Sequence, residues 1–168
     1  MQKKLRQYLF FILAGITYII LHEGIHAIQA IILGIYKDIK LHPLGLEIVL
    51  KQPLTINGMT LARFSGLSSI LTIVIGYLIY FLTPRIIKLR KQFLRNYLYF
   101  VGFVFLLLDP LYISILSFFV GGDINGIAQG LNTSYTLVRL FYFVIFCLNL
   151  YLVIKKYYPQ YVPSPNKE

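Results

Sequence analysis

The chain is poor in acidic residues, in cysteine and in charge of any kind. Of its 168 residues, 6 are Asp or Glu and 1 is Cys, and only 13% are charged. The single cysteine, Cys147, excludes a disulfide within the chain. Hydrophobic residues make up 58% of the sequence, and the mean hydropathy is +0.72. This composition excludes an ordinary soluble domain, because a domain of this size has too small an interior for so much apolar surface.

Four apolar stretches are each close to, or above, the roughly 20 residues that cross the hydrocarbon core of a bilayer. They cover about residues 8–35, 65–82, 97–120 and 137–154. The sequence therefore predicts an all-α, multi-pass membrane protein with about four transmembrane helices and the lipid bilayer as a partner. We expect a single membrane-embedded domain over residues 1–158 and a short flexible tail over residues 159–168.

Basic residues outnumber acidic ones by 16 to 6, which gives a net charge of +10. In a soluble protein this excess would indicate a nucleic-acid partner. Here the basic residues gather at the ends of apolar stretches, as the positive-inside rule describes. They form three groups: Lys3, Lys4 and Arg6; Arg85, Lys88, Arg90, Lys91 and Arg95; Lys155 and Lys156. We therefore expect both termini on the cytoplasmic side and no nucleic-acid partner.

The segment between the first and second apolar stretches does not have a helical pattern. It contains Pro43, Pro53 and several β-branched residues, and the pair Asn57-Gly58 between "LTI" and "MTL" is typical of a type I′ turn. The sequence predicts a small β-hairpin or sheet here, near the membrane surface. The small residues of "FSGLSSI", which follow, predict that the second helix packs closely against the first.

The motif His22-Glu23-Gly24-Ile25-His26 lies inside the first apolar stretch. On a helix the two histidines stand one turn apart on the same face, so both rings can reach one Zn²⁺ at about 2.0–2.1 Å. In zinc proteases of this pattern the glutamate takes a proton from water and passes it to the leaving amine. An ionisable group inside the membrane costs about 2.5–3.5 kcal/mol or more, so these three residues are expected to be functional.

A catalytic zinc site takes three protein ligands and one open position, so a third ligand must come from the few acidic residues. Asp109 and Asp123 are the two candidates in the third stretch and the loop after it. Depth along an unbroken helix favours Asp109, whereas Gly121-Gly122 favour Asp123, because unwound backbone in a membrane lines a cavity. We expect Pro110 to break the helix between them. If Asp123 is not the ligand, it would cap a helix at the surface. If Asp109 is not the ligand, it would hydrogen-bond backbone groups freed by Pro110.

At these residues the sequence resembles the site-2 protease family of intramembrane zinc metalloproteases. The resemblance rests on "HEGIH" and on the order of Asp109-Pro110 and Gly121-Gly122-Asp123 in "DPLYISILSFFVGGDINGI". The chain does not contain the family's usual Asn-x-x-Pro…Leu-Asp-Gly motif. The resemblance implies a core of three helices and a third ligand in a Gly-containing, partly unwound segment. On this basis we assign Asp123 as the third zinc ligand, with Asp109 as the alternative.

The resemblance also implies a zinc metalloendopeptidase that cleaves a transmembrane protein substrate within or near its membrane span. An edge strand of the predicted "LTINGMTL" hairpin can pair with the unwound substrate. The candidate substrate-binding residues are Asn57, Gly58, Asp109 and Asn125. The alternative is a membrane metal-binding or accessory protein without proteolytic activity. Glu23 favours the protease, because a pure binding site does not need it. The sequence leaves open whether the protein forms a homo-oligomer.

Overall fold

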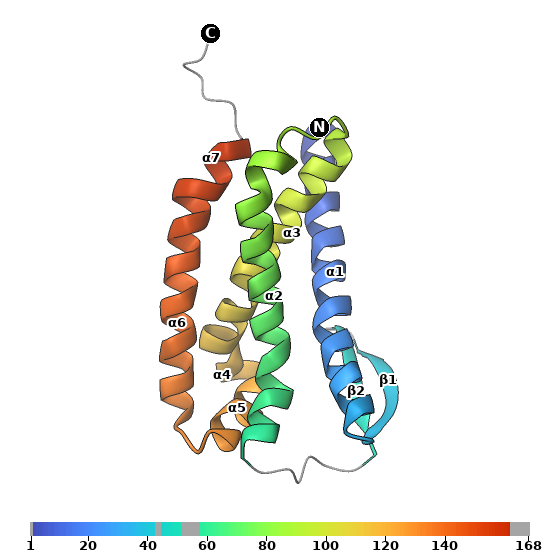
Figure 1. The fold of residues 1–168 in the computed structure, drawn as a ribbon, viewed down its shortest axis with the longest axis vertical. Coiled ribbons are helices and arrows are strands. Elements are labelled where there is room, and N and C mark those ends of the chain that lie inside the picture. The colour runs from blue at the N-terminus through green and yellow to red at the C-terminus, as the bar shows by residue number, and fades with distance from the viewer. Residues whose placement is uncertain (1, 43–44, 52–57, 162–168) are drawn as a thin grey trace.

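The computed structural model describes residues 2–42, 45–51 and 58–161. Within these residues four helices are long and apolar enough to cross a membrane, which confirms the predicted fold class. They cover Lys4–Ile32, Met59–Ile86, Gln92–Val120 and Tyr135–Tyr161. Figure 1 shows them as an elongated bundle in which the start of the first helix and the end of the last lie at the same end.

The elements follow one another in a simple order. Helix α1 (Gln2–Ile32) leads to strands β1 (Tyr36–His42) and β2 (Gly45–Leu50), then to α2 (Met59–Ile86) and α3 (Gln92–Leu111). A π-helical stretch (Tyr112–Leu116) joins α3 to α4 (Ser117–Val120), which is followed by α5 (Asp123–Gly130) and α6 (Tyr135–Leu152). A second π-helical stretch (Val153–Tyr157) continues into α7 (Tyr158–Tyr161). The last helix thus runs three residues past the domain boundary predicted at residue 158, and the rest of the predicted tail lies outside the described residues.

The two strands form the antiparallel sheet predicted between the first and second spans, but the turn is not where the sequence placed it. The register pairs Lys40 with Glu47 and His42 with Gly45. The predicted turn at Asn57-Gly58 is wrong, because the "MTL" segment is the first turn of α2. Gly58 has a φ of 74° and its carbonyl accepts bonds from the first turn of that helix, so its left-handed backbone starts a helix. Asn57 lies outside the described residues.

Close packing between α2 and α5 fixes the position of α5. A Cβ at Gly130 would lie 2.3 Å from the backbone nitrogen of Ala62, and one at Gly126 would lie 1.8 Å from Oγ of Ser65. No side chain fits at either position unless the helices move apart. The small residues of "FSGLSSI" therefore permit the contact of α2 with α5 as well as its contact with α1.

A buried amide in α6 compensates for the proline inside α3. Pro110 does not break the helix as predicted, since α3 continues through it. It has no N–H, so the carbonyl of Leu106, four residues earlier, has no helical partner. Asn149 Nδ2 donates to that carbonyl at 2.7 Å, and its Oδ1 accepts a bond from the Tyr77 hydroxyl at 2.5 Å. One fully buried side chain thus links α2, α3 and α6.

Candidate metal centre

Two histidines and a carboxylate converge at the junction of α1, α2 and α5. Nε2 of His22 lies 3.1 Å from Oδ2 of Asp123, and Nε2 of His26 lies 3.4 Å from Oδ1 of the same carboxylate. One ligand atom from each of the three residues lies within 4.8 Å of the other two. Both histidines are buried and Asp123 is partly buried. The structure therefore brings both motif histidines together with the assigned aspartate.

A turn of two glycines brings Asp123 to the histidines. Gly121 and Gly122 have φ values of 69° and 90°, in the left-handed region that favours glycine. The Tyr112 hydroxyl donates to the Gly121 carbonyl at 2.9 Å and holds this turn. The helix stays regular or π-helical as far as Val120, so depth along one unbroken helix does not apply to Asp123, which comes after the turn.

Gly122→Ala should lower the metal content after dialysis by about 10-fold or more. The variant would displace Asp123, and displacing a ligand should reduce metal affinity at least as much as losing a residue that orients a ligand. A Cβ at this position would lie 1.9 Å from the Tyr112 hydroxyl oxygen, and the φ of 90° strains any L side chain. Adding Tyr112→Phe removes the clashing oxygen and should restore part of the metal. Gly24→Ala is the matched control, because a Cβ there meets nothing within 4 Å. Wild-type metal content in Gly122→Ala would show that the turn is not needed.

Asp109 lies on the other side of the His22 ring. Its Oδ1 is 3.3 Å from Nδ1 of His22, and the Tyr18 hydroxyl donates to the same oxygen at 2.7 Å. Histidines that bind metals almost always donate their other ring N–H to a carboxylate or a similar acceptor, which fixes the ring and its tautomer. The Tyr18 hydroxyl and Oδ1 of Asp109 thus both lie against Nδ1 of His22, and Nε2 of the same ring is directed at Asp123.

The remaining contacts of the Asp109 carboxylate come from α2. Ser69 donates to Oδ1 at 3.0 Å, and Thr72 donates to Oδ2. The alternative in which Asp109 bonds backbone freed by Pro110 is therefore not what the structure contains. Asp109 is fully buried, so it offers no surface for the substrate contact that the sequence suggested.

The electrostatic environment of Asp123 keeps its carboxylate charged. Burial by itself would raise the pKa of this carboxyl, but the hydrogen bonds with His22 and His26, and the charges of both rings, lower the pKa to about 2. A carboxylate must be deprotonated to bind a metal ion. Asp123 is therefore in the ligand form at neutral pH.

The donor atoms face a cavity of about 590 Å³, and Glu23 lines the same cavity. Part of the lining comes from β2, through Leu46, Glu47 and Ile48. Of the other candidate substrate-binding residues, Gly58 lies at the start of α2 and Asn125 is exposed on α5, and neither lines this cavity. The cavity thus combines three candidate metal donors, the carboxyl groups of Glu23 and Glu47, and part of a strand.

Sequence reasoning missed three residues that contact the site. Tyr18 precedes His22 by one helical turn, so the i, i+4 spacing was a signal that could have found it. Ser68 lies within hydrogen-bond distance of both histidines, at 3.0 Å and 3.3 Å from their Nε2 atoms. Neither this contact nor that of Tyr112 with the glycine turn had a local signal, because both depend on how distant segments pack.

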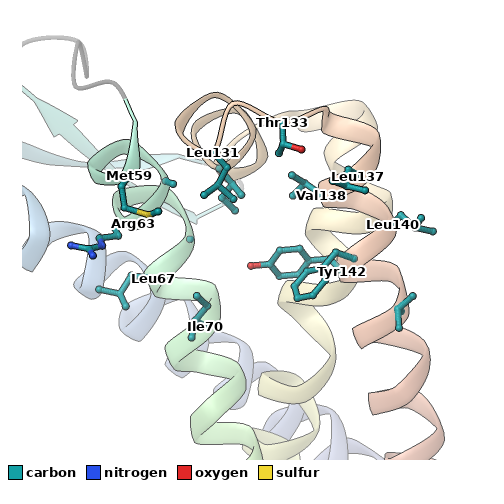
Figure 2. Close-up of a pocket in the computed structure, with 15 residues that line it drawn as sticks. Met59, Arg63, Leu67, Ile70, Leu131, Thr133, Leu137, Val138, Leu140 and Tyr142 are labelled. Atoms are coloured by element: carbon teal, nitrogen blue, oxygen red, sulfur yellow. The ribbon is translucent and has the colours of Figure 1, made fainter.

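A second, larger hollow of about 800 Å³ lies between α2, α5 and α6 (Figure 2). Its walls are almost entirely apolar, and the polar side chains among the labelled residues are Arg63, Thr133 and Tyr142. None of the candidate metal donors lines it. The residues capable of metal chemistry therefore gather in the smaller cavity.

Comparison of the chain with protein-family models, with curated proteins and with solved structures gives no match. The resemblance to the site-2 protease family stays a prediction from the motifs. The chemical case for a function comes from the donor atoms, the cavity and Glu23.

Proposed function

We propose that the protein is an intramembrane zinc metalloendopeptidase that hydrolyses peptide bonds in or near the transmembrane segments of other membrane proteins. The observation that carries the proposal is the meeting of His22, His26 and Asp123 in one cavity that also contains Glu23. The cavity belongs to a chain with four helices apolar enough to span a membrane. A substrate there would be a membrane-embedded peptide segment.

The donor set fits a catalytic zinc ion. Two imidazole nitrogens and one carboxylate oxygen are a set that catalytic zinc sites use, and the adjoining cavity leaves room for water and substrate. A zinc ion bound by these residues would lower the pKa of a bound water molecule to about 7 and polarise the scissile carbonyl. Asp109, through Nδ1 of His22, fixes the ring orientation that such binding needs.

The chain's own residues supply the proton transfer and the positioning. Glu23 takes the proton from the attacking water at its carboxylate and gives it to the nitrogen of the leaving amine. Because β2 lines the cavity, it is the strand placed to pair with the unwound substrate by β-augmentation. This role belongs to Leu46–Ile48 and replaces the hairpin predicted at Asn57-Gly58.

Metal analysis of the purified protein tests the proposal directly. Wild-type protein should contain about one zinc ion per chain, as a three-ligand catalytic site does. His22→Ala should lose the ion, because it removes a ligand whose nitrogen lies 3.1 Å from the Asp123 carboxylate. His42→Ala, which changes the third histidine of the chain, is the matched control and should keep the zinc. Wild-type protein that binds no divalent metal would overturn the proposal.

We further propose that both termini face the cytoplasm. The start of α1, the α2–α3 connection and α7 lie at the same end of the bundle, and the three basic groups fall there (Figure 1). In a Cys147→Ser background, Lys88→Cys and Lys155→Cys should react with an impermeant thiol reagent from the cytoplasmic side. Asn132→Cys, in the α5–α6 connection, should react from the other side only. Labelling of Lys88→Cys and Asn132→Cys from the same side would contradict this orientation.

A further inference from the structure

Ser68 of α2 presents its hydroxyl to both motif histidines. Its Oγ lies 3.0 Å from Nε2 of His26 and 3.3 Å from Nε2 of His22, and the residue is fully buried. Hydroxyl groups inside helices commonly bond the carbonyl four residues earlier, as Thr72 and Thr83 do here. The hydroxyl of Ser68 faces instead the same two nitrogen atoms that face Asp123.

The distances around Ser68 match those between ligand atoms of one tetrahedral ion. Bonds of about 2.0–2.1 Å place neighbouring donor atoms about 3.3–3.4 Å apart. The Asp123 contacts are 3.1 Å from Oδ2 to His22 and 3.4 Å from Oδ1 to His26, whereas the single Oγ of Ser68 makes both of its contacts, at 3.0 Å and 3.3 Å. We propose that Ser68 Oγ is a fourth protein donor to the metal, an inference that rests on the metal centre of the proposed function.

With His22 in the tautomer that binds a metal, hydrogen bonds alone do not satisfy all of these contacts. If Nδ1–H of His22 is directed at Asp109, Nε2 of that ring has only a lone pair to offer. This lone pair faces both a charged carboxylate and the hydroxyl of Ser68. The hydroxyl has a single proton, so it can donate to only one of two unprotonated ring nitrogens, and it could accept from the other only if that nitrogen carried a proton. A cation between the four atoms would satisfy all of the lone pairs together.

A fourth protein donor has a consequence for the resting protein. Catalytic zinc sites keep one position open for water, whereas sites with four protein donors are closed. A neutral hydroxyl is the weakest of the four donors here, since the others are two imidazoles and a carboxylate. Ser68 therefore keeps the resting centre closed, and its hydroxyl has to move away, or a fifth position has to open, before water and substrate enter.

Cobalt substitution of Ser68→Cys provides a spectroscopic test. A thiol that coordinates a metal is deprotonated, and the thiolate gives an intense charge-transfer band with Co²⁺ in the near ultraviolet. We expect this band in Ser68→Cys, together with tighter metal binding, because a thiolate is a stronger ligand of these ions than a neutral hydroxyl. Ser69→Cys is the matched control. The hydroxyl of Ser69, the next residue along the helix, donates to Asp109 and does not face the histidine Nε2 atoms. Native Cys147 lies on α6 and is not among the candidate donors, so the wild-type protein should show no band.

Ser68→Ala gives an independent measurement should the cysteine variant not fold. We expect about 10-fold weaker metal binding and a changed visible spectrum of the cobalt protein. No charge-transfer band in folded Ser68→Cys, or an unchanged spectrum and affinity in Ser68→Ala, would overturn the role of Ser68 while the wild-type centre still binds metal. Wild-type protein that binds neither zinc nor cobalt would instead overturn the proposed function itself.

Discussion

Glu23→Gln should leave the metal bound and lower the cleavage of a membrane-protein substrate by about 10²-fold or more. The amide keeps the size and most of the hydrogen bonding of the carboxylate but cannot accept the proton. Glu23 lines the cavity without belonging to the cluster of donor atoms, so its replacement removes no metal ligand. The measurement is cleavage of a single-span reporter protein in liposomes, with metal content determined on the same preparations.

Glu47→Gln is the matched control for this change. Glu47 is the other glutamate in the lining of the cavity, but it lies on β2 and outside the motif. Its amide variant should keep its metal and cleave within a few-fold of the wild-type rate. Undiminished cleavage by metal-loaded Glu23→Gln would exclude Glu23 as the base. A wild-type protein that holds zinc and cleaves no membrane substrate would favour the metal-binding or accessory alternative.

Asp123→Ala should lose the metal, whereas Asp109→Asn should keep it with weaker affinity. Asp123 faces Nε2 of both histidines, so its removal leaves two protein ligands besides Ser68. The expected loss of affinity is more than about 100-fold, beyond the 10–100-fold typical of residues that orient a ligand. Of the two histidines Asp109 contacts only His22, through Nδ1, and its variant should fall inside that range. Isothermal titration with zinc in detergent measures both values.

The two aspartate variants also separate the alternatives that the sequence left open. A metal-free Asp109→Asn beside a metal-loaded Asp123→Ala would make Asp109 the third ligand. Retention of metal by both variants would direct the search to Glu47, which lines the same cavity. Thermal unfolding of each variant in detergent is the necessary control, because Asp109 also accepts bonds from three hydroxyl groups.

The fold class and the two histidines were predictable because their signals are local. Apolar runs near 20 residues long report membrane spans directly, and His22 and His26 share a helix face through their spacing alone. Gly121-Gly122 marked the turn before Asp123 for the same reason, since glycine tolerates positive φ. Such features are encoded within a few residues of one another.

The errors and omissions have a different physical origin. Gly58 has the left-handed backbone that a turn signal implies, but that conformation starts a helix as well as it closes a hairpin. Pro110 carries the strongest local breaking signal in the third span, yet Asn149, 39 positions later in the chain, supplies the missing donor. Contacts made across the bundle decided both the course of α3 and the partners of Asp109. No local pattern records them.

The bond from Asn149 to the Leu106 carbonyl bears on whether the last helix is a separable module. A chain ending before Tyr135 would keep all three donor residues, since they belong to α1 and α5. It would leave a main-chain acceptor of α3 and the Tyr77 hydroxyl without their partners inside the membrane, where each unsatisfied group costs several kcal/mol. The fourth helix therefore completes the hydrogen bonding of α3 around Pro110 and is not separable from the other three helices without leaving these groups unpaired.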